Sequence, residues 1–96
     1  MLTNKQKSYL RSLANQKKSL VQIGKDGISY SLVQSLEVSL EAHELVKVNL
    51  LKTAPITAQH AAVELAAQTK SEIIQIIGKT IIFYRKNPDG KIELPK

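Results

Sequence analysis

Apolar residues recur with two different periods along the chain, and the alternation of these periods predicts the order of the elements. Helical spacing marks three segments, at roughly 3–15, at roughly 30–43 and after Pro55. Each of these segments follows a hydroxyl side chain that can cap a helix. The predicted caps are Thr3, which has Gln6 at capping-box spacing, then Ser29 or Ser31, and finally Thr57.

Four other runs have the composition of strands. The segment 20–23 is short and apolar, and the segment 44–51 alternates apolar residues with Lys47 and Asn49, as in a half-buried strand. Two runs rich in isoleucine follow at 72–78 and 80–85, and Gly78-Lys79 between them is typical of a hairpin. The tetrapeptide NPDG at 87–90 predicts a turn, and the final KIELPK is a terminal extension that could add a short strand.

The predicted order is therefore α-β-α-β-α-β-β. We expect an α/β chain of the α+β type, with one sheet and with helices that pack mostly on one face or flank it. A length of 96 residues with 43% apolar residues suits one domain over residues 1–96. The sequence contains no internal repeat, low-complexity segment or linker.

Composition and the absence of certain sequence patterns argue against several classes of protein. There is no cysteine, so disulfides, thiolate metal sites and a cysteine nucleophile are ruled out. The N-terminus has no apolar signal segment, and no apolar run approaches the roughly 18 residues of a membrane span, so we expect a soluble cytoplasmic protein. His43-Glu44 and the pair of His60 and Glu64 match no metal-ligand or catalytic spacing. We therefore expect no catalysis, no metal, no cofactor and no small-molecule substrate.

The positive charge is concentrated in the first quarter of the chain. The net charge is +6, and the first 25 residues contain no acid but six basic side chains, which are Lys5, Lys7, Arg11, Lys17, Lys18 and Lys25. The rest of the chain then has 14 − 6 = 8 basic and 8 acidic side chains, which cancel. This asymmetry favours a polyanionic partner such as RNA, DNA or an anionic membrane. A lysine-rich face that only aids solubility is the alternative.

Gly24-Lys25-Asp26-Gly27 forms a G-x-x-G motif between a predicted strand and a predicted helix. Glycine permits positive φ and the close approach of another backbone, and the N–H groups at the start of the following helix attract anions. The motif can therefore bind a phosphate, as the GxxG loop of KH modules does. Lys25 adds a cation and Asp26 opposes it, and a tight turn that binds nothing is the simpler interpretation.

Further cations extend this candidate surface. Lys7 and Arg11 are four residues apart and share one face of the first predicted helix. Lys79 lies at the tip of the predicted hairpin, and Arg85 lies at the end of its second strand. Tyr84 beside it could stack on a base, although packing in the core or at its rim is the commoner role of such a tyrosine.

Taken together, these motifs resemble the bacterial YhbY-like family, whose members are stand-alone CRM (chloroplast RNA splicing and ribosome maturation) domains. The resemblance is carried, in chain order, by LTNKQKSYLRSLA, LVQIGKDGIS, HELVKVNLL and IIGKTIIFYRK, and it covers about residues 2–95. It implies a compact domain with a four-stranded mixed sheet, flanking helices and a KH-like GxxG turn. It also implies a fold similar to the C-terminal domain of translation initiation factor three.

The resemblance further implies RNA binding and association with precursors of the large ribosomal subunit. The residues that we expect to contact RNA are Gly24, Lys25, Asp26, Gly27, Lys5, Lys7, Arg11, Lys17, Lys18, Lys79 and Arg85. Because aromatic residues are few and lysines many, RNA shape should matter more than base sequence. Binding should also weaken steeply with salt. We expect a monomer, since no apolar stripe calls for a dimer.

A protein–protein adaptor on the ribosome is the alternative function. In that case Glu37, Glu41 and Glu44 on the second predicted helix form the docking face. Contact between RNA and the basic end of the protein would then be incidental.

Overall fold

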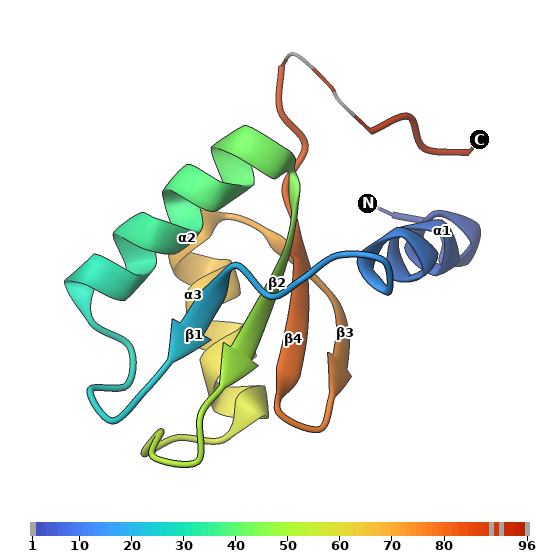
Figure 1. Cartoon of the computed structure of the whole chain (residues 1–96). Coiled ribbons are helices and arrows are strands. Elements are labelled where there is room, and N and C mark those ends of the chain that lie inside the picture. Colours follow the sequence, from blue (N-terminus) through green and yellow to red (C-terminus); the bar gives the residue numbers. More distant parts are fainter. Residues whose placement is uncertain (1, 89, 91, 96) are drawn as a thin grey trace.

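The computed structural model describes residues 2–88, 90 and 92–95, in which it places three helices and four strands (Figure 1). In chain order these are α1 (Asn4–Ala14), β1 (Val21–Ile23), α2 (Tyr30–His43), β2 (Leu45–Leu50), α3 (Ala58–Thr69), β3 (Glu72–Ile77) and β4 (Thr80–Tyr84). The predicted order α-β-α-β-α-β-β is confirmed. In the terminal extension, residues 92–95 lie in no strand, and Lys91 and Lys96 lie outside the described residues.

The helices begin at the predicted hydroxyl caps. Thr3 Oγ1 accepts a hydrogen bond from Gln6 N at 3.1 Å, and Thr3 N donates to Gln6 Oε1 at 3.0 Å, so the capping box is complete. Ser29 rather than Ser31 caps α2, and Thr57 caps α3. In each case the side chain satisfies a backbone N–H that has no partner within the helix.

The four strands form one mixed sheet in the order β1-β2-β4-β3. β1 and β2 are parallel and are connected through α2, whereas β4 is antiparallel to both of its neighbours. The predicted hairpin joins β3 to β4, and Gly78 adopts φ +56° at its turn. β4 is buried at four of its five positions, because it is an interior strand whose two faces are both covered.

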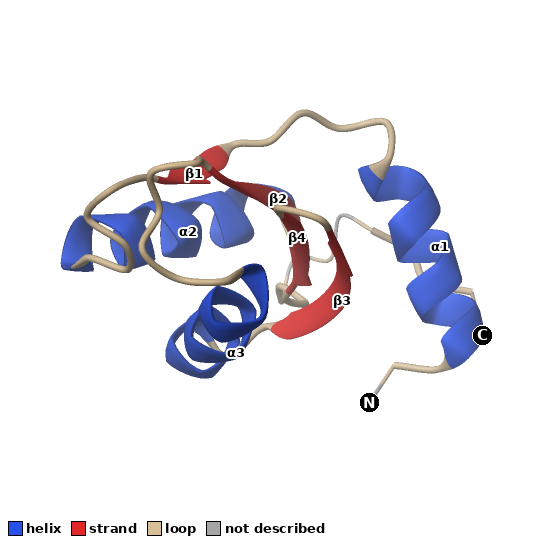
Figure 2. Cartoon of the chain, turned by 90° about the horizontal axis from the view of Figure 1, so that it is seen from below, coloured by secondary structure: helices blue, strands red, loops and turns tan. Residues whose placement is uncertain are grey.

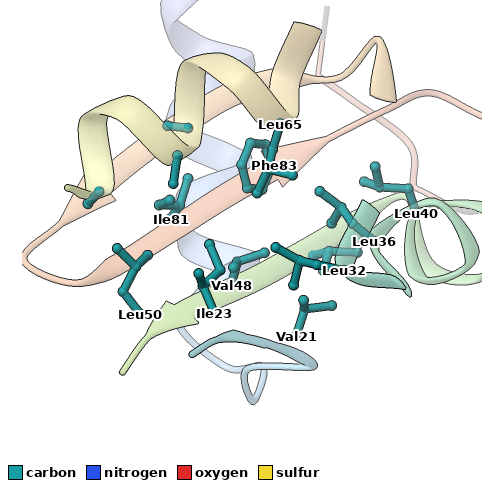
Figure 3. Close-up of a cluster of buried hydrophobic side chains, with 14 residues drawn as sticks. Val21, Ile23, Leu32, Leu36, Leu40, Val48, Leu50, Leu65, Ile81 and Phe83 are labelled. Atoms are coloured by element: carbon teal, nitrogen blue, oxygen red, sulfur yellow. The ribbon is translucent and has the colours of Figure 1, made fainter. Parts of the chain in front are cut away.

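Two hydrophobic clusters lie on opposite faces of the sheet. α2 and α3 cover one face and α1 covers the other (Figure 2). Figure 3 shows the larger cluster, where Leu36 of α2 and Leu65 of α3 pack with Phe83 of β4. The smaller cluster contains Leu10, Ala14, Leu45, Ile74, Ile82 and Tyr84. Two of the three helices therefore share one face, as expected, and α1 lies on the other, because alternate side chains of β4 give the sheet a second apolar face that α1 buries.

The segment after β4 packs against α1. Ile92 and Leu94 contact the smaller cluster, and Gln6 Nε2 of α1 donates a hydrogen bond to the carbonyl of Pro95 at 3.0 Å. The backbone N–H of Gly90 donates to the carbonyl of Asn87 at 3.0 Å, as expected for the predicted turn at 87–90, of which Asp89 lies outside the described residues. This segment therefore helps to hold α1 on the sheet.

Glu44 is fully buried, although the adaptor hypothesis places it on an exposed docking face. It ends α2 with φ +64°, and its carboxylate accepts hydrogen bonds from the backbone N–H groups of Asn87 at 3.2 Å and Ile92 at 3.0 Å. Its own carbonyl accepts from the N–H of Arg85 at 2.9 Å. The expectation for Glu44 is therefore wrong, because the chain after β4 covers this carboxylate.

Candidate nucleic-acid interface

Three loops meet at one end of the sheet, at the bottom of Figure 1. The parallel strands β1 and β2 both end there, and Leu51 N donates to the carbonyl of Ile23 at 2.9 Å. The hairpin between β3 and β4 reaches the same edge, since Leu50 N donates to the carbonyl of Lys79 at 2.7 Å. We call this edge the loop end, and it comprises residues 24–28, 51–57 and 78–79.

The G-x-x-G motif forms a tight turn at the loop end, and its two glycines differ in what the fold requires. Gly27 N donates to the carbonyl of Gly24 at 3.0 Å. Gly27 has φ +64°, and a Cβ at this position would lie 3.3 Å from Pro55 Cγ. At Gly24 a Cβ would meet only Leu51 Cδ1, at an ordinary 3.7 Å. The fold therefore requires glycine at the second position and not at the first.

We expect Gly27→Ala to lower the free energy of unfolding by about 1–2 kcal/mol, because the left-handed backbone costs an L-residue that much. Gly24→Ala should leave stability unchanged, since its Cβ has room and its backbone is not left-handed. Urea unfolding of the two variants measures the difference. An equal loss in both would contradict this assignment of roles.

Two helices begin at the loop end, because α2 and α3 each follow a strand that ends there. Neither has an acidic residue in its first turn, so no carboxylate there offsets the positive end of either helix dipole. A groove of about 550 Å³ lies between the turn and the start of α2. The residues that line it include Leu20, Gly24, Lys25, Asp26, Gly27, Ser29, Ser31, Ser35 and Thr53.

Each loop of the loop end carries one exposed lysine. Lys25 lies in the turn, Lys52 follows β2 and Lys79 lies in the hairpin, whereas Asp26 is the one acid among the three loops. None of these lysines forms an ion pair with any part of the chain that the structure describes. Lys52 is not among the residues predicted from the sequence. The sequence alone does not place Lys52 near Lys25, because the two lysines come together only through the parallel pairing of β1 and β2.

The other predicted cations do not join this site. Lys5, Lys7 and Arg11 lie on α1, which packs on the sheet face opposite α2 and α3 (Figure 2). Lys5 is exposed, and the other two are partly exposed. Lys17 and Lys18 are exposed in the loop between α1 and β1. The structure therefore divides the predicted basic surface into a loop-end part and an α1 part.

Arg85 forms a partly buried ion pair within the fold. Its Nη1 donates to Glu37 Oε2 at 2.9 Å and to the carbonyl of Thr69 at 2.9 Å, and its side chain is 19% exposed. This guanidinium thus joins α2 and the end of α3 to the chain that follows β4. Of the three acids on the hypothetical docking face, Glu37 is paired here and Glu44 is buried, which leaves Glu41 as the exposed one.

Tyr84 packs in the smaller cluster and is 4% exposed, so its ring cannot stack on a base. Burial raises the pKa of its hydroxyl above the ordinary value, and the nearby carboxylates of Glu44 and Glu72 raise that pKa further. The side chain therefore stays neutral at physiological pH. Of the two roles that the sequence left open for this residue, the structure supports core packing.

One histidine lies beside a carboxylate on α3. His60 Nε2 and Glu64 Oε2 lie 3.1 Å apart, one turn apart on α3, and both side chains are exposed. Among the described residues, no group of three His, Asp or Glu side chains could hold a metal ion. Within the same residues, no helix combines the length and the apolar character that crossing a membrane requires.

Comparison with known proteins connects this geometry to a family. The model of the CRS1 / YhbY (CRM) domain matches residues 2–85. "Probable RNA-binding protein YqeI" of Bacillus subtilis is 38% identical over 96 residues, which cover 99% of this chain and 100% of the relative. An "RNA-binding protein" of Haemophilus influenzae is 32% identical over 95 residues, which cover 99% and 96% of the two chains.

A solved structure is also similar to this chain in both sequence and fold. The solution structure of the hypothetical protein SAV1595 from Staphylococcus aureus matches with a TM-score of 0.82 and 42% identity, and the match covers 99% of this chain and 100% of that one. The sequence motifs around the G-x-x-G turn and the last hairpin lie within the region matched by the family model. The chain therefore belongs to the CRS1/YhbY (CRM) domain family.

Proposed function

We propose that this protein binds RNA, and that the loop end is its principal contact with the RNA backbone. The observation that carries the proposal is the meeting of four features at one edge of the sheet: the G-x-x-G turn, the starts of two helices, three exposed lysines and the groove beside them. Relatives over nearly the full chain are named RNA-binding proteins, which supports the same conclusion.

The arrangement suits phosphate more than base edges. Backbone N–H groups at a helix start donate to phosphate oxygens, and lysine binds phosphate as a point charge. Gly24 leaves space beside the turn for the backbone of the nucleic acid, since the fold itself does not require glycine there. Lys5, Lys7, Arg11, Lys17 and Lys18 would add a weaker electrostatic attraction from the other face of the molecule. We assign Arg85 to support of the fold, because its guanidinium is already bonded within it.

The test is a comparison of two variants that each lose three positive charges. Lys25→Gln, Lys52→Gln and Lys79→Gln together should weaken binding of a labelled short single-stranded RNA by about 100-fold at 0.1 M salt, from the loss of three phosphate contacts. Lys5→Gln, Lys7→Gln and Arg11→Gln together should weaken it by less than about threefold. Fluorescence anisotropy gives both affinities, and circular dichroism checks that both variants are folded. If the variant of α1 loses as much affinity as the variant of the loop end, or more, the assignment of the loop end is overturned.

We further propose that the RNA is ribosomal and belongs to precursors of the large subunit, as the family resemblance implies. Sedimentation of the tagged protein from cell lysate, with sequencing of the RNA that co-purifies, tests this step separately. Enrichment of large-subunit precursor RNA that is lost at high salt would support it. A protein that stays at the top of the gradient at low salt, with no enriched RNA, would contradict it.

A further inference from the structure

The four aromatic side chains of the chain differ widely in exposure. Phe83 and Tyr84 are buried, Tyr9 on α1 is 40% exposed, and Tyr30 is 80% exposed. A single exposed tyrosine is unremarkable by itself. The position of Tyr30 distinguishes it, because it begins α2 two residues after the loop end.

Tyr30 is the first residue of α2 and directly follows the cap Ser29. Ser29 and Ser31, on either side of it, both line the groove beside the G-x-x-G turn, whereas Tyr30 itself does not line the groove and its side chain is exposed. Side chains on a helix incline towards its N-terminus. We therefore expect the ring of Tyr30 to lean towards the turn that we propose to bind phosphate.

A second groove continues from the first along α2. It has a volume of about 420 Å³, it is lined by Leu20, Gln34, Ser35, Val38 and Ser39, and it shares Leu20 and Ser35 with the first groove. Leu20 is 53% exposed and Val38 is 64% exposed. No cation lines this second groove, so it suits the apolar face of a base and not a phosphate.

We propose that the RNA bound at the loop end is single-stranded there, that one of its bases stacks on the ring of Tyr30, and that a neighbouring base lies against Leu20 and Val38. This inference rests on the proposed RNA binding and adds the class of RNA. A base within a duplex has both faces covered by its neighbours, so only an unpaired base can offer a face to the ring. Stacking tolerates all four bases, because each has a π-face.

The experiment compares Tyr30→Ala and Tyr30→Phe with Tyr9→Ala, which removes the other exposed tyrosine from the opposite face of the sheet. Tyr30→Ala should weaken binding of single-stranded RNA by about 10-fold, which is within the range for the loss of one stacked base. Tyr30→Phe and Tyr9→Ala should bind as the unchanged protein does. A duplex RNA and an abasic oligonucleotide should not distinguish Tyr30→Ala from the unchanged protein.

A spectroscopic readout reports the stacking directly. The chain has no tryptophan, so Tyr30→Trp introduces a single tryptophan. Its emission should be quenched when single-stranded RNA saturates the protein and unchanged when the abasic oligonucleotide is added. Unchanged emission with both probes would overturn the stacking contact.

The failure of this inference and that of the proposed function can be distinguished. If the triple lysine variant of the loop end loses affinity while Tyr30→Ala does not, the stacking is overturned and the phosphate contact stands. If neither variant loses affinity, both the stacking contact and the proposed binding of RNA at the loop end are overturned. If Tyr30→Ala impairs binding to a protein of the ribosome and not to purified RNA, the groove belongs to a protein contact and the inference is overturned.

Discussion

Replacing Glu44 with alanine should lower the free energy of unfolding by about 3 kcal/mol, which is the largest effect that we expect from a polar residue of this chain. The carboxylate is fully buried and accepts hydrogen bonds from Asn87 N and Ile92 N. Alanine leaves these two partly buried donors without their acceptor, at about 1–3 kcal/mol for each group. It also opens a cavity where the end of α2 meets the chain after β4.

Urea unfolding of three variants measures this effect. Glu44→Gln keeps the volume and one acceptor oxygen, so its loss should be smaller than that of Glu44→Ala. Glu41→Ala removes an exposed carboxylate of the same helix and should change stability by less than about 0.5 kcal/mol. If Glu44→Ala and Glu41→Ala are equally stable, the buried carboxylate does not hold the segment after β4 in place.

Raising the salt concentration from 50 to 200 mM should weaken RNA binding by about 20-fold. Three lysine–phosphate contacts with a single strand give a slope of about −2 in log affinity against log salt, because about 0.7 counterion is released per phosphate. A fourfold rise in salt then lowers the affinity by 4 to the power of about 2.1. The variant that lacks Lys25, Lys52 and Lys79 should lose about 2 units of this slope.

The control for the salt titration is a pair of exposed lysines at the opposite end of the sheet. Lys70 precedes β3 and Lys86 follows β4, where Glu72 pairs with Tyr84. Lys70→Gln with Lys86→Gln should keep the slope of the unchanged protein. An affinity that is flat between low and physiological salt, or a slope that depends on this pair as much as on the loop end, would contradict the proposed interface.

Two contacts of α2 connect the stability of the fold with the proposed function, namely the partly buried Arg85–Glu37 ion pair and the buried carboxylate of Glu44. Arg85 joins β4 to α2 through Glu37, and Glu44 joins the end of α2 to the chain after β4. Glu37 lies near the middle of α2 and Glu44 at the end that is remote from the turn, so the two contacts together hold this helix against the chain that follows β4. We therefore expect substitutions at Arg85 to act on RNA binding through the placement of α2 and not through a lost phosphate contact.

Local features of the sequence were sufficient to predict the elements and the turn. The capping box at Thr3 and the hairpin at Gly78 depend on residues within four positions of each other, so both can be predicted from the sequence alone. Helical and alternating periods likewise depend on near neighbours. The same holds for the G-x-x-G turn, whose closing hydrogen bond joins Gly24 and Gly27.

Only the tertiary structure decided which charged and aromatic side chains face water. Arg85 and Glu37 are 48 positions apart, and Lys52 joins Lys25 only because β1 and β2 pair in parallel. Tyr84 is buried and Tyr30 is exposed, and this difference depends on the segments that pack over each ring. The burial of a side chain depends on the distant segments that pack over it. A charged or aromatic side chain can therefore be assigned to a binding surface only when the tertiary structure shows that it is exposed.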